Sequence, residues 1–70
     1  MESAYVSLLA RVEREIVAME TQMTLHSEYV SLREPADPRR VHSVCFIQAS
    51  KTVLNGLYLL RARCLDRIYG

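Results

Sequence analysis

The residues that could bind a metal in this 70-residue chain are two histidines, two cysteines and eight acidic side chains. His42 and Cys45 lie three positions apart and would share one face of a helix, a spacing that suits two ligands of a zinc ion. A structural zinc site needs four ligands, and the sequence has no second pair at such a spacing. A partner chain would have to supply the others, so we expect no metal and no cofactor.

Motifs for catalysis are equally scarce in the sequence. It has no glycine-rich phosphate loop, no nucleophile elbow and no HExxH motif. Glu13, Glu15 and Glu20 supply carboxylates, but such residues on a helix are more typical of a solvated face than of an acid–base pair. We predict that the protein is not an enzyme and that it has no catalytic residue.

Eight of the nine basic residues are arginines, and their expected places on the helices separate them into two groups. Arg61, Arg63 and Arg67 would lie near a helix C-terminus, where cations interact favourably with the helix dipole. Arg39 and Arg40 would lie in the first turn of a helix, where positive charge is unfavourable. We therefore predict that Arg39 and Arg40 contact a partner or a phosphate group.

A second candidate surface combines Tyr58, Leu59 and Arg63. An aromatic, an aliphatic and an arginine side chain close together form a composition typical of a protein-binding hot spot. Scattered exposed apolar residues are also normal on any protein, which is the alternative interpretation. We predict that these three residues bind a protein partner.

Two helices joined by a proline-rich turn would position these residues. A residue before proline is pushed out of the helical region, so Pro35 ends the first helix near Arg33 or Glu34. Asp37 followed by Pro38 is typical of a helix start, with an aspartate N-cap and proline in the first helical position. The sequence predicts one domain over 1–70, with a helix over about 3–33, a turn over 34–37 and a helix over about 38–68.

Apolar residues recur at heptad spacing in both predicted helices, and the short turn makes the helices antiparallel neighbours. The predicted fold is an all-α antiparallel two-helix hairpin in which His26 lies near Phe46. His26 takes a position where leucine would be routine, so it either sets the register of the helices or is a partly buried histidine bonded to a hydroxyl or backbone group. The predicted core and dimer residues are Leu9, Val12, Ile16, Met19, Met23, His26, Phe46, Val53, Leu57, Leu60 and Cys64.

Half of the chain is hydrophobic, although a domain of this length buries only a small core. The apolar arc of each predicted helix is broader than the strip that one neighbouring helix can cover. We therefore predict a homodimer in which two hairpins form an antiparallel four-helix bundle. The alternative is a different partner chain that supplies the missing helices.

Charge and hydropathy narrow the expected partners and compartment. A formal net charge of +1 gives no long-range attraction to nucleic acid or to an anionic membrane. The uncharged stretches 41–50 and 52–60 are shorter than the roughly 20 apolar residues of a membrane-spanning helix. The first residues lack the basic region of a signal peptide. We expect a cytosolic protein with buried, reduced cysteines, and neither nucleic acid nor membrane as a partner.

In size, helical economy and absence of catalytic motifs, the chain resembles small phage-encoded proteins that bind host regulators, including quorum-sensing transcription factors and pilus ATPases. The resemblance covers no motif and implies a protein that binds a larger regulatory protein through its helix faces and inhibits or modulates it. One alternative is an RNA-binding bundle similar to the plasmid repressor-of-primer protein, although near-zero net charge weakens it. Another is a chaperone or assembly subunit of a heteromeric complex.

Overall fold

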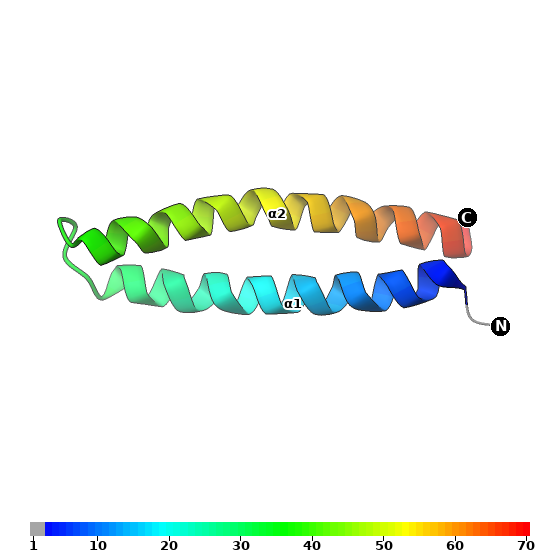
Figure 1. Ribbon diagram of the computed structural model, residues 1–70, viewed down its shortest axis with the longest axis horizontal. Helices are drawn as coiled ribbons and strands as arrows, with labels where there is room; N and C mark the ends of the chain where they lie inside the picture. The colour runs from blue at the N-terminus through cyan, green and yellow to red at the C-terminus, as the bar shows by residue number, and fades with distance from the viewer. Residues whose placement is uncertain (1–2) are drawn as a thin grey trace.

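Two long helices make up the computed structural model, which describes residues 3–70. Helix α1 spans Ala4–Ser31 and helix α2 spans Pro38–Tyr69. The helices run antiparallel and lie side by side, with the connection at one end and the start of α1 beside the end of α2 at the other (Figure 1). The molecule is a rod with extents of 54 × 16 × 12 Å. The predicted all-α antiparallel hairpin is confirmed.

Capping residues define where both helices begin. The Ser3 hydroxyl accepts a hydrogen bond from the Tyr5 amide at 3.2 Å and caps α1. The Asp37 carboxylate accepts one from the Arg39 amide at 2.9 Å, and Pro38 takes the first position of α2. Aspartate and proline thus act at the start of α2 as the sequence predicts, because each fits the unpaired amides of a first helical turn.

The connection between the helices comprises residues 32–37, two more than predicted, and α1 ends at Ser31 rather than near residue 33. The Leu32 and Arg33 amides each bond to a carbonyl three residues back, at 3.2 Å, so the chain tightens before it leaves the helix. A turn follows in which the Asp37 amide donates to the Glu34 carbonyl at 3.0 Å. Pro35 stands at the second position of this turn, where its fixed φ is favourable. At its other end α2 continues to Tyr69, one residue beyond the predicted limit.

The contact between the helices buries a narrow row of side chains. The buried hydrophobic residues are Val12, Ile16, Leu54 and Cys64. Five half-buried residues pack against their centre: Leu8, Met19, Met23, Leu57 and Leu60. Two serines of α2, Ser43 and Ser50, are buried in the same row, so small hydroxyl side chains take positions that a larger apolar residue would otherwise fill. A single hairpin therefore has a thin core.

Other residues predicted for the core or dimer contact are less covered than their pattern suggests. Leu9 and Phe46 are half-buried. Val53 is 49% exposed, whereas Leu54 is 7% exposed and faces α1 in its place. The reason is that the face of α2 that contacts α1 contains Ser50 and Leu54, whereas Val53 lies at the edge of that face. Of the two free cysteines, which were both expected to be buried, Cys64 is buried and Cys45 is exposed.

Replacing Leu54 by alanine removes a large part of this thin core. We expect Leu54→Ala to lower the free energy of unfolding by about 2–3 kcal/mol, since it deletes buried methyl groups and leaves a cavity. Urea denaturation followed by circular dichroism, at one fixed protein concentration, measures the change. The control is Leu59→Ala, because Leu59 is 66% exposed. The packing described here is refuted if both variants lose the same stability.

Candidate interaction surfaces

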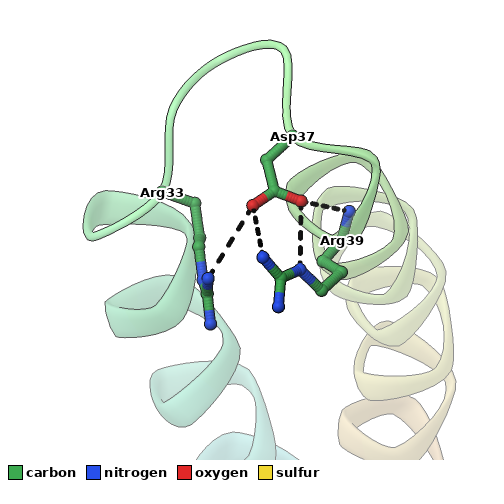
Figure 2. Close-up of polar contacts among 3 residues, drawn as sticks. All are labelled: Arg33, Asp37 and Arg39. Carbon is green, nitrogen blue, oxygen red and sulfur yellow. Dashed lines mark hydrogen bonds and ion pairs between the residues drawn. The ribbon is translucent and has the colours of Figure 1, made fainter.

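The connection end of the rod carries a compact cluster of charges around Asp37 (Figure 2). Arg39 donates from Nε to Oδ1 of Asp37 at 3.2 Å and from Nη2 to Oδ2 at 3.1 Å, a two-pronged contact. Arg33 approaches from the other side, with Nη1 3.8 Å from Oδ2. The Arg33 guanidinium also lies over the Tyr29 ring, 4.5 Å from its centroid. These contacts tie the end of α1 to the start of α2.

One of the two arginines predicted to bind a partner, Arg39, belongs to this cluster. Hydrogen bonds from the Arg39 side chain and amide lower the pKa of Asp37 below its ordinary value, and the same contact raises the pKa of Arg39. Arg39 therefore has an acidic partner within its own chain, which offsets its charge in the first turn of α2. Arg40 is half-buried and has no ion pair or side-chain hydrogen bond within residues 3–70. Of the two, Arg40 is the one without an acidic partner within residues 3–70, whereas Arg39 is paired and its side chain is 65% exposed.

His26 joins the two helices near the same end. Its Nδ1 atom lies 3.1 Å from the Ser43 hydroxyl, and the two are hydrogen-bonded. Its ring stacks on Phe46 with a centroid distance of 4.2 Å and an interplanar angle of 30°. The pairing of His26 with Phe46 is as predicted from the heptads. The histidine bonded to a hydroxyl is the interpretation that the geometry matches.

A hollow of about 550 Å³ opens on the surface beside His26. Its walls come from both helices and are mostly apolar; the lining residues are Leu25, His26, Tyr29, Pro38, Arg39, His42 and Ser43. Cys45 does not line this hollow. Within residues 3–70 no group of three or more histidine, cysteine or acidic side chains could hold a metal. The hollow is therefore an open and mostly apolar surface to which both helices contribute.

Polar contacts bridge the helices along one side of the rod, which we call the bridged side. The Tyr58 hydroxyl donates to Oε1 of Glu20 at 3.0 Å, and Arg61 Nε donates to Oε1 of Glu13 at 3.4 Å. The hydrogen bond to Glu20 raises the pKa of Tyr58. A shallow groove on this side is lined by both pairs together with Ile16 and Val17. The bridged side is therefore crossed by two polar contacts of the hairpin itself, and Val17 beside them is 65% exposed.

Of the three residues predicted as a hot spot, Tyr58 and Arg63 line different grooves, whereas Leu59 and Arg63 are four positions apart on α2 and share a face of the helix. Tyr58 lies on the bridged side, held by Glu20. Arg63 lines a different groove with Leu8 and Leu60. Leu59 is 66% exposed. Tyr58 and Arg63 are five positions apart, which is about 140° around a helix, so the spacing already separates them.

Comparison with known proteins adds no assignment to these surfaces. No protein family, no curated protein and no solved structure matches the chain. Neither helix, over the residues that the structure describes, is long and apolar enough to cross a membrane. The surfaces of the hairpin are therefore interpreted from their own chemistry.

The Asp37 cap makes the stability of the hairpin dependent on pH. Because the pKa of Asp37 in the folded chain lies below its ordinary 3.8, its contribution is complete above that value and is lost as the pH falls through the folded pKa. We expect the melting temperature of Asp37→Ala to lie below that of the wild type at about pH 7, and the difference to shrink toward about pH 2. Asp37→Asn keeps an oxygen that caps the helix and should lose less. A difference that is constant with pH contradicts this role.

The bond between His26 and Ser43 predicts a non-additive pair of substitutions. Ser43→Ala leaves a ring nitrogen of His26 without its partner, so we expect it to cost about 1 kcal/mol of unfolding free energy. Adding His26→Leu removes the unpaired nitrogen and should recover most of that loss. A double-mutant cycle by urea denaturation measures the coupling. If the two single costs simply add, the bond is without energetic consequence.

Proposed function

We propose that this protein is a non-enzymatic interaction module that dimerises into a four-helix bundle and binds a larger regulatory protein, such as a transcription factor or an ATPase, which it inhibits or modulates. The observation that carries the proposal is the large surface that one hairpin leaves in contact with water. Two free cysteines fit a protein that works in the reducing cytosol.

The accessible area of the hairpin is too large for a compact monomer. The scaling of area with mass gives about 4,500 Å² for a compact chain of 8.1 kDa. The hairpin exposes 5463 Å². The excess of about 1,000 Å² is close to the roughly 800 Å² that each partner buries in a standard protein interface. A second copy of the chain would cover an area of this size.

The shape of the hairpin supports the same proposal. Its radius of gyration is 15.9 Å, whereas a compact 70-residue domain has about 11 Å. A bundle of two hairpins has twice the chain in a rod of similar length, and its core is closed by four helices instead of two. The half-buried residues that pack around the thin core, such as Met19 and Leu60, would then be covered.

Residues outside the helix contact are available for the larger target. Val41 and Leu59 are exposed apolar residues of α2, and Arg40 is a cation without an acidic partner within residues 3–70. A helix that presents such residues can lie in a groove of another protein and block it or change its shape.

Affinity capture with the tagged protein, followed by binding of the purified candidate, tests the proposed target. We expect Arg40→Glu and Leu59→Ala each to weaken that binding by about 10-fold or more. Arg14→Glu and Val17→Ala are the matched controls, since both residues are exposed on α1. A target that binds all four variants with wild-type affinity refutes these contacts. Retention on heparin that is lost only at high salt would instead favour nucleic acid.

A further inference from the structure

We infer that the second copy docks on the side of the hairpin opposite the bridged side, antiparallel to the first about a twofold axis near Val53. The inference rests on the proposed dimer and names its interface. The contact surface is a row of residues along α2, which we call the outer seam: His42, Phe46, Ala49, Val53, Gly56 and Leu60.

Helix α2 carries two heptad rows side by side. The first faces α1 and includes the buried residues Ser43, Ser50, Leu54 and Cys64. The outer seam repeats in steps of four and three positions, one residue out of phase with the first row. A helix with two adjacent rows of this kind contacts two neighbouring helices, as in four-helix bundles. The hairpin supplies only one of those neighbours.

The two sides of the rod differ in their polar contacts. The six residues of the outer seam include no aspartate, glutamate, lysine or arginine, and the same spacing continues into Arg39 before His42 and Arg63 after Leu60. Phe46 stacks on the His26 ring, and His42 lines the mostly apolar hollow. Val53, between the ends of the seam, is 49% exposed. The other side holds the polar contacts of Tyr58 and Arg61 with α1. A second copy that covers the outer seam therefore desolvates apolar groups and leaves the bridged side in water.

The order of side-chain sizes in the outer seam identifies a second copy as the partner. Phe46 and Leu60 stand seven positions before and after Val53, and Ala49 and Gly56 stand four before and three after it. From Phe46 to Leu60 the row is therefore nearly symmetric about Val53, with small residues next to Val53 and large residues at both ends of this stretch, and His42 lies beyond it. A twofold interface requires a self-complementary patch, and an antiparallel copy centred on Val53 places small residues against small and large against large.

Gly56 supports a close approach from outside the chain. A Cβ atom at this position would meet nothing within 4 Å in the hairpin, so no contact within the chain requires glycine there. Glycine in a helix interior lowers helix stability relative to alanine. A helix that packs closely over Ala49 and Gly56 gives the glycine a function, because small residues let helix axes approach. The same helix would extend over the hollow, which shares His42 with the seam.

The interface is tested by light scattering during size exclusion at micromolar concentration. We expect the wild type at twice the chain mass of 8.1 kDa and Val53→Arg at the chain mass, with a dissociation constant raised about 100-fold or more. The control Leu59→Arg places the same charge on α2 outside the seam and should stay dimeric. A monomeric wild type refutes the proposed dimer itself. A dimeric wild type with dimeric Val53→Arg refutes only this interface.

Disulfide formation tests the axis without a destabilising charge. In a Cys45→Ser background, Val53→Cys should link two chains under oxidised glutathione, because the two new thiols lie beside the axis. Ala49→Cys should not, since two copies of residue 49 would lie at least about 12 Å apart along the helices, beyond the roughly 7 Å that a disulfide allows. Linking of both variants would place the connections at the same end of the dimer and overturn the antiparallel arrangement. Failure of Val53→Cys to link would overturn the axis.

Discussion

Two helices in contact can cover only one strip of each other's surface, and this limit governs the whole molecule. Within residues 3–70, four hydrophobic residues are buried, and they lie in a single row between α1 and α2. A third or fourth helix is the usual means of covering the remaining arcs. The elongated shape, the half-buried methionines and the apolar outer seam all follow from a hairpin whose helices carry more apolar residues than their mutual contact can hide.

Polar contacts determine where the helices begin and how they are aligned. Asp37 begins α2 and gathers two arginines, while His26 and Ser43 hold the helices in register a few turns away. Exposed ion pairs contribute little free energy, so their main effect here is geometric. Apolar rows alone tolerate a shift of one helix along the other, whereas hydrogen bonds between particular atoms do not.

The sequence predicts the two helices, the Asp37–Pro38 start and the proximity of His26 to Phe46, because these depend on local preferences and on heptad spacing. It does not distinguish Val53 from Leu54 as the inward residue, because two apolar rows lie side by side and either could face α1. The partner of Arg39 is also beyond a pattern of residue types, since it depends on how the connection folds back. The extra length of that connection arises from a tightened last turn, which has no distinct composition.

The rod shape has a consequence for how such a module could act on its target. In the proposed antiparallel dimer, the two connection ends point in opposite directions along a stiff body about as long as the 54 Å hairpin. Each outward surface is then present twice, at fixed separation. A target that is itself multimeric would be bound at two points. Once the first contact has formed, the second binding surface is held near its site at a high effective concentration. The length of the dimer thus fixes the distance between the two copies of each binding surface. Contacts that are weak individually can then select a target whose subunits are spaced to match that distance.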